Sequence, residues 1–95
     1  MKKNTPSTID PDQFEGLAKA MEEFNPFTIL GSKRDPEWGY EHVHLLFIQF
    51  NDGSFGLCIY DTRKKGFIEE PGDLEMYGRT PEEIKTKYGF DFPTK

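Results

Sequence analysis

The fold is decided by the stretch EHVHLLFIQFNDGSFGLCIY, residues 41–60. Two runs dominated by Val, Ile, Leu and Phe stand on either side of Asn51-Asp52-Gly53. An Asp-Gly pair supplies the positive φ angles that a tight turn between two strands requires. The pattern therefore predicts a β-hairpin that lies at the centre of the fold.

We expect Asp52 and Gly53 to form a two-residue loop, because this loop gathers the large side chains on one face. The facing pairs are then Phe50 with Phe55, Ile48 with Leu57, Leu46 with Ile59, and His44 with Asp61. A three-residue loop would instead place Ile48 opposite Gly56. A sheet with one buried side selects against that one-residue slip.

The second face of the hairpin is also too apolar for simple exposure to solvent. It is expected to carry Val43, Leu45, Phe47, Cys58 and Tyr60. Strands that are apolar on both faces are typical of the centre of a sheet that is covered on both sides. If the C-terminal residues do not suffice to cover this face, we expect a homodimer to bury the remainder.

Helices are predicted on both sides of this hairpin in the sequence. DPDQ, residues 10–13, has the spacing of a capping box with a proline in the first turn. An apolar stripe follows at helical spacing, formed by Phe14, Leu17, Ala18, Met21 and Phe24. This helix should end before Pro26 and pack its stripe on the apolar face of the hairpin. TPEE, residues 80–83, opens a second, short helix that ends at Gly89.

Two further strands are predicted over residues 27–30 and 67–70, the first ending at Gly31-Ser32 and the second at Pro71-Gly72. Residues 71–79 carry no clear pattern. The elements together predict an α+β fold: an antiparallel three- or four-stranded β-meander with an N-terminal helix packed on one face and a short C-terminal helix. Residues 1–8 are polar and aperiodic, which predicts a flexible N-terminal tail before a single domain over residues 9–95.

Length, charge and cysteine content limit the class of protein. The chain has 95 residues, one cysteine and a formal net charge of −5 at pH 7. A single cysteine forms no internal disulfide, and residues 1–8 lack the apolar run of a signal peptide or membrane anchor. We therefore expect a cytoplasmic protein without a membrane partner. The negative charge disfavours general binding of nucleic acid, and the lack of a cofactor motif predicts no cofactor.

Two histidines and an aspartate form a candidate metal site. His42 and His44 lie at alternate positions of a strand and therefore share a face, and the expected register sets Asp61 opposite His44. Imidazole and carboxylate groups are ligands for zinc, and imidazole also suits copper. The simpler interpretation is a pair of histidines at the start of a strand, one hydrogen-bonded to Asp61. Cys58 is expected on the opposite face, as a buried structural thiol.

In an antiparallel meander the loop before residue 41 and the turn after residue 60 lie at the same end of the sheet. That end should gather basic and aromatic residues of an acidic chain: Lys33, Arg34, Trp38, Tyr40, His42, Arg63, Lys64 and Lys65. Because Trp and Arg often dominate the energy of protein interfaces, the pattern predicts a partner-binding surface. The alternative is that Trp38 covers the core and the lysines only keep a turn soluble.

The sequence thus predicts a small acidic cytoplasmic module that recognises or inhibits a protein partner by surface contact, without catalysis. One alternative is a metal- or small-ligand-dependent protein that uses His42, His44 and Asp61. Another is contact with nucleic acid through Lys33-Arg34 and residues 63–65. A further candidate surface is the acidic segment of residues 69–83, which has six acids against a single arginine.

Overall fold

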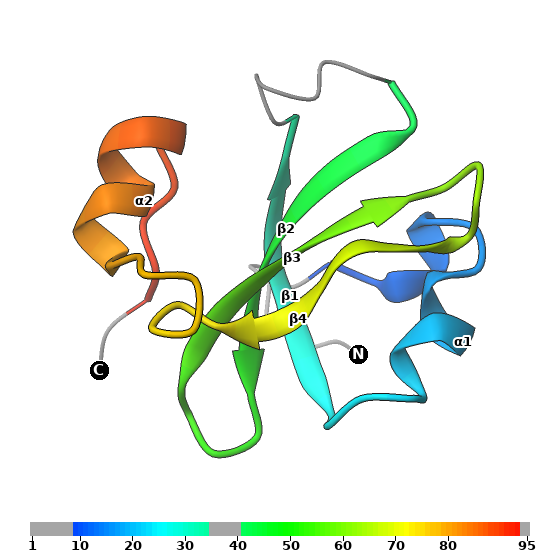
Figure 1. Ribbon diagram of the computed structural model, residues 1–95, viewed down its shortest axis with the longest axis horizontal. Coiled ribbons are helices and arrows are strands. Elements are labelled where there is room, and N and C mark those ends of the chain that lie inside the picture. Colours follow the sequence, from blue (N-terminus) through cyan, green and yellow to red (C-terminus); the bar gives the residue numbers. More distant parts are fainter. Residues whose placement is uncertain (1–8, 35–40, 94–95) are drawn as a thin grey trace, which may run out of the picture.

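One antiparallel sheet of four strands forms the centre of the structure (Figure 1). The computed structural model describes residues 9–34 and 41–93. Its elements are the 3-10 helix η1 (Pro11–Gln13), α1 (Leu17–Met21), β1 (Phe27–Lys33), β2 (Val43–Phe50), β3 (Phe55–Asp61), β4 (Gly66–Asp73) and α2 (Pro81–Tyr88). Each strand pairs antiparallel with its neighbour along the chain, so the expected α+β meander is confirmed, with four strands.

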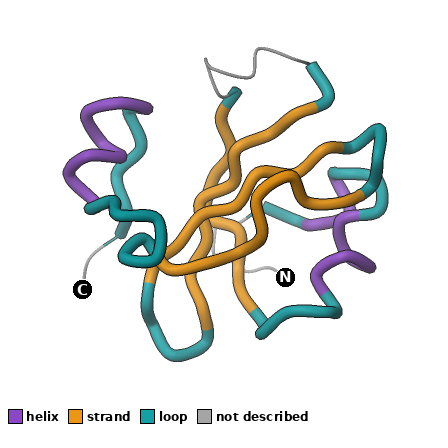
Figure 2. Tube along the Cα trace, in the orientation of Figure 1, coloured by secondary structure: helices purple, strands orange, loops and turns teal. Residues whose placement is uncertain are grey.

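The helical regions are short, and α2 lies apart from η1 and α1 (Figure 2). In that view α2 lies to the left of the strands, and η1 and α1 lie to the right. Within residues 9–34 and 41–93, no helix has the length and apolar character needed to span a bilayer.

The turn between β2 and β3 has three residues, where two were expected. Ile48 pairs with Gly56, which is the register that the sequence argument rejected. The N–H of Phe50 donates to the carbonyl oxygen of Ser54 at 2.9 Å, and Gly53 has a φ of 93°. A three-residue hairpin loop that closes on a glycine with positive φ is a common alternative to the two-residue loop. The expectation was wrong because it chose the register from one buried face alone, although the second face was also expected to be covered. Both faces of this hairpin are buried, so either register buries the large side chains.

Each face of the sheet has its own hydrophobic cluster. The buried members of the first are Leu30, Val43, Leu45, Phe47, Leu57, Ile59, Leu74, Ile84 and Phe92. Those of the second are Leu17, Phe27, Ile29, Leu46, Ile48, Cys58 and Tyr60. Cys58 and Tyr60 therefore belong with Leu46 and not with Phe47 as expected, because the register differs by one residue. The central hairpin therefore contributes side chains to both clusters.

We expected a homodimer on the second face only if the C-terminal residues did not cover it, and the chain itself covers the part of this face that Val43, Leu45 and Phe47 form. Val43, Leu45 and Phe47 are at most 2% exposed. The ring of Phe90 stacks on Phe47 with 4.3 Å between centroids, and Phe92 meets Phe47 edge-on at 5.9 Å. The C-terminal aromatic residues thus cover Phe47, while Tyr60, which the homodimer argument also included, lies on the other face.

The predicted N-terminal helix is broken in the middle. η1 ends at Gln13, and Gly16 takes a left-handed φ of 82° before α1 starts at Leu17. The hydroxyl of Tyr60 donates to the carbonyl oxygen of Glu15 at 2.8 Å and so holds the break. A Cβ atom on Gly16 would lie 2.9 Å from that hydroxyl, so both the φ angle and the close approach require glycine.

The break also changes which residues of the predicted stripe reach the core. Leu17 is buried, and Phe14, Met21 and Phe24 pack against the second cluster. Ala18 is exposed, and Ala20 packs against the cluster instead.

The remaining elements confirm one prediction and extend two others. β1 continues past a bulge between Ile29 and Gly31 to Lys33, and β4 continues through Pro71 to Asp73. Pro71 is tolerated because β4 is an edge strand. α2 has the expected capping box, with Thr80 and Glu83 each accepting from the other's backbone N–H, and it ends at Gly89 with a φ of 72°.

Candidate partner-binding surface

The turn between β3 and β4, residues 62–65, carries three exposed basic side chains in succession, and we call it the basic turn. They belong to Arg63, Lys64 and Lys65. The turn closes when the N–H of Lys65 donates to the carbonyl oxygen of Asp61 at 2.8 Å. Lys65 itself has a positive φ of 57°, which a non-glycine residue seldom adopts. The backbone of this turn is therefore held in a specific and somewhat strained form.

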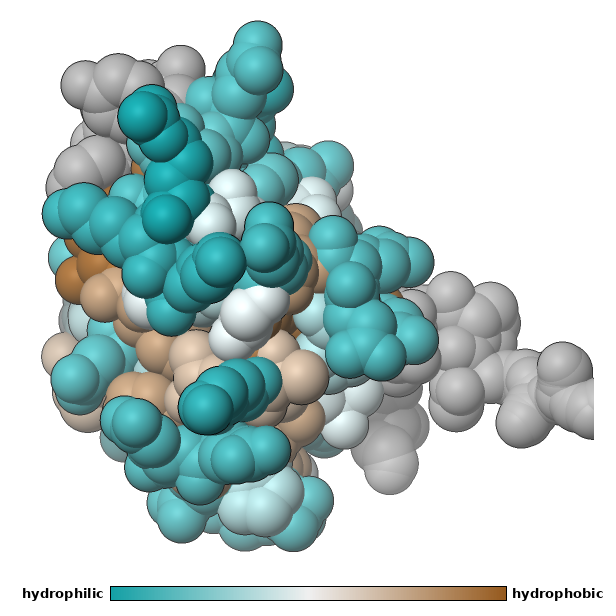
Figure 3. Space-filling view, turned by 90° about the vertical axis from the view of Figure 1, so that its right-hand side faces the viewer, coloured by the Kyte–Doolittle hydropathy of each residue, from teal (hydrophilic) through white to brown (hydrophobic). Residues whose placement is uncertain are grey.

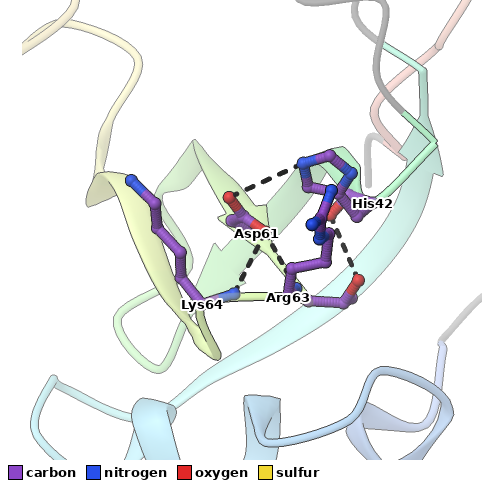
Figure 4. Close-up of polar contacts among 5 residues, drawn as sticks. His42, Asp61, Arg63 and Lys64 are labelled. Atoms are coloured by element: carbon purple, nitrogen blue, oxygen red, sulfur yellow. Dashed lines mark hydrogen bonds and ion pairs between the residues drawn. The ribbon is translucent and has the colours of Figure 1, made fainter.

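The buried carboxylate of Asp61 fixes this backbone (Figure 4). Asp61 is 4% exposed, and its Oδ1 accepts from the N–H of Arg63 at 2.8 Å and of Lys64 at 3.2 Å. Its Oδ2 lies 4.0 Å from Nε2 of His42. Burial raises the pKa of Asp61, but the two N–H groups and His42 lower it by more, so the net pKa lies below its ordinary value. The carboxylate is therefore charged at neutral pH and bonds firmly to the turn.

Neighbouring segments brace the turn from two directions. Thr62 donates to the carbonyl oxygen of His42 through its N–H at 2.8 Å and through its hydroxyl at 3.2 Å. On the other side, Nζ of Lys65 lies 3.2 Å from Oε2 of Glu15. That ion pair is exposed, so it is worth little by itself. The side chains of Arg63 and Lys64 extend from a backbone that is tied on both sides.

Lys33 and Arg34 lie at the same end of the sheet as the basic turn. Lys33 pairs with Leu45 near the start of β2, and Val43 pairs with Asp61 at the end of β3. Figure 1 shows, however, that the twist of the sheet fans the end of β1, at the top, away from the β3–β4 turn, at the right. Trp38 and Tyr40, the aromatic members of the predicted surface, lie outside the described residues.

Of the three predicted metal ligands, the structure brings His42 and Asp61 within 4.0 Å of each other, and His44 has different surroundings. Asp61 pairs with Val43 and not with His44 as expected, because of the one-residue change of register. The ring of His44 packs edge-on against Phe14 at 4.8 Å. Burial lowers the pKa of His44, and the positive charge of Arg34 lowers it as well. Over residues 9–34 and 41–93, no group of three or more His, Cys, Asp or Glu is placed to hold a metal ion.

Cys58 lies in the core and on the same face as His44, where the sequence argument placed it opposite. Leu46 pairs with Cys58, and His44 pairs with Tyr60, so all four share one face. The thiol is fully buried, and burial raises its pKa far above the ordinary range. A thiol that remains protonated and is inaccessible is a poor nucleophile, as expected for a structural cysteine.

Two residues that organise the basic turn were not recognised from the sequence. Asp61 was weighed as a metal ligand or as the hydrogen-bond partner of a histidine, although an aspartate immediately before a polar turn commonly accepts from N–H groups two or three residues later. Glu15 was placed inside a continuous helix. Its contacts with Tyr60 and Lys65 carry no sequence signal, because they join residues 45 and 50 positions apart.

Comparison with known proteins gives no relative. No family model matches the sequence, and no curated protein or solved structure matches it.

Proposed function

We propose that this chain is a non-catalytic binding module that recognises a protein partner through the basic turn. The observation that carries the proposal is the pairing of exposed Arg63 and Lys64 with a backbone fixed by a buried carboxylate. A surface that is ordered before binding loses little conformational entropy when the partner arrives. Inhibition of that partner by occupation of its surface is the simplest consequence of such contact.

The charge distribution favours an acidic protein surface as the target. The chain as a whole is acidic, with a net charge of −5, so the basic turn is a local exception. Complementary local charge accelerates encounter and selects between partners more than it adds affinity. The surrounding negative charge would repel the phosphates of a nucleic acid and so weaken their attraction to the basic turn. An acidic patch on a protein can match the turn without extending over the rest of the surface.

The test is affinity capture from a lysate of the source organism, followed by quantitative mass spectrometry. We expect Arg63→Glu/Lys64→Glu to reduce capture of the specific partner about tenfold or more, equivalent to about 1.4 kcal/mol. The purified partner should then bind the parent chain more weakly as salt is raised, because exposed charges are screened.

The matched control is Lys85→Glu/Lys87→Glu, which makes the same change of net charge on α2. Both lysines are exposed, and α2 lies on the opposite side of the molecule from the basic turn (Figure 1). Circular dichroism should show both variants folded. Equal capture by the parent and the Arg63→Glu/Lys64→Glu variant would refute the proposal, as would an equal loss in the control. In that case the acidic segment of residues 69–83 becomes the next surface to test.

A further inference from the structure

A groove of about 480 Å³ lies at the end of the sheet opposite the basic turn. It is bounded by the segment between α1 and β1, the turn between β2 and β3, and the last residues of β4. β3 runs from the turn at this end to the basic turn at the other, so the two surfaces are separated by the length of a strand. We call this feature the acidic groove.

Part of the wall of the acidic groove is aromatic, and other rings hold these aromatic side chains in place. Phe24 meets Phe67 edge-on at 5.4 Å, and Phe50 meets Phe27 edge-on at 5.9 Å. Both Phe24 and Phe50 line the groove and remain partly exposed. The hollow is therefore preformed, which is typical of sites that take an apolar side chain.

Met76 stands at the margin of this groove, and it is 64% exposed. Among residues 9–34 and 41–93, Met76 is the only large hydrophobic residue that is exposed. Its side chain lies over Gly72, where even a Cβ atom would collide with the methyl group. A methionine is flexible and polarizable, so it adapts its shape to an incoming side chain.

The charged side chains that line the groove are all acidic. They are Asp52 and Asp73, both exposed. Within the described part of the chain, neither carboxylate takes part in an ion pair. Oδ1 of Asp52 accepts from the N–H and hydroxyl of Ser54, which holds the carboxylate in position. A hollow with aromatic side chains and a methionine on its wall and two carboxylates beside them is complementary to an apolar side chain next to a cation.

We infer that the acidic groove binds a segment of a protein partner in which an arginine or lysine stands next to an apolar side chain. The apolar side chain enters between Phe24, Phe50 and Met76, and the cation lies between the carboxylates of Asp52 and Asp73. This surface is separate from the basic turn and has the opposite charge. It therefore accepts a different segment of a partner, and the inference does not depend on the function proposed above.

The probe for the test is a capped tetrapeptide of alternating leucine and arginine. The full chain is labelled with carbon-13 at its methionine methyl groups, and the Met76 resonance is assigned by its loss in Met76→Leu. We expect the peptide to shift the Met76 resonance in a saturable manner. Asp52→Asn/Asp73→Asn should weaken binding about fivefold, as expected for two exposed charge pairs of roughly 0.5 kcal/mol each. The asparagine at position 52 keeps an oxygen that can accept from Ser54.

Two matched controls define the result. The same tetrapeptide with glutamate in place of arginine should leave the Met76 resonance unchanged. Glu41→Gln/Glu82→Gln removes the same charge from exposed positions outside the groove and should bind the arginine peptide as the parent does. The inference is overturned if the two peptides shift Met76 equally, or if neither shifts it. It is also overturned if Met76 shifts with protein concentration alone, because the occupant is then a second copy of this chain.

Discussion

The turns on either side of β3 use the same hydrogen bond in different surroundings. In both, an aspartate accepts from the N–H two residues later, Asp52 from Ser54 at 3.0 Å and Asp61 from Arg63 at 2.8 Å. Asp52 is exposed to solvent, whereas Asp61 is 4% exposed. A hydrogen bond away from water is stronger, and its loss leaves donors without a replacement.

The residues that close the two turns, both at positive φ, also differ between the exposed turn and the turn with the buried aspartate. The exposed turn closes on Gly53, which has a φ of 93° and meets no steric obstacle. The basic turn closes on Lys65, a non-glycine residue with a φ of 57°. The comparison teaches that a buried cap can hold a lysine in a conformation that a solvent-exposed turn leaves to glycine.

The sharpest way to break this comparison is to remove each aspartate in turn. Asp61→Ala should lower the thermal midpoint by on the order of 10 °C, because the N–H groups of Arg63 and Lys64 lose their acceptor at a buried position. Asp52→Ala should lower it by only a few degrees, since water replaces the exposed carboxylate. Thermal unfolding followed by circular dichroism measures both, and equal losses would contradict the argument. Asp61→Asn keeps one acceptor oxygen and should recover part of the loss.

Acid should weaken both aspartate caps. Hydrogen bonds from Ser54 lower the pKa of Asp52, and the pKa of Asp61 is also lowered in spite of its burial. A carboxylate with a lowered folded-state pKa contributes stability above its unfolded-state pKa and loses it as the pH falls through the folded-state pKa. The free energy of unfolding should therefore decrease from about pH 5 to about pH 2.

Urea titrations at a series of pH values measure this decrease. Asp61→Asn and Asp52→Asn should each flatten the dependence. If neither substitution changes the slope, other carboxylates control acid unfolding and the two caps are not its cause.

The smallest effects should come from exchanging the closing residues. Gly53→Ala should destabilise the fold by about 1 kcal/mol, because alanine is strained at positive φ. Lys65→Gly should stabilise it by roughly 0.5 kcal/mol, since relief of strain exceeds the entropy that glycine adds to the unfolded chain. Loss of the exposed pair with Glu15 subtracts little. Urea unfolding measures both changes in stability. Lys64→Gly is the control and should destabilise the fold. A loss of stability in Lys65→Gly would show that the φ of Lys65 carries no strain.

Local patterns were sufficient to predict most of the secondary structure. The two apolar runs gave the central strands, and the TPEE sequence predicted the capping box of α2 at Thr80 and Glu83. These elements are specified by residues close together in the sequence, so no tertiary contact can override them easily.

The errors arose where tertiary contacts decide between local alternatives. The hairpin register depends on whether one face or both are buried, and this depends on the C-terminal aromatic residues that cover Phe47. The break at Gly16 depends on Tyr60, which is distant in the sequence. Of the candidate surface, the basic side chains were predicted from the meander topology, but the buried cap that orders them was not. Its burial is a property of the assembled sheet.

The link between Tyr60 and Glu15 also has a consequence for the time at which the N-terminal region can fold. η1 and α1 leave the ribosome before the four strands, but both are too short to be stable as isolated helices. The residues that hold this region come later in the chain. The carbonyl oxygen of Ile29 accepts from the N–H of Ile9, and the hydroxyl of Tyr60 donates to the carbonyl oxygen of Glu15. We therefore expect the first part of the chain to wait during synthesis until β3 has emerged, and to dock only after the hairpin has formed.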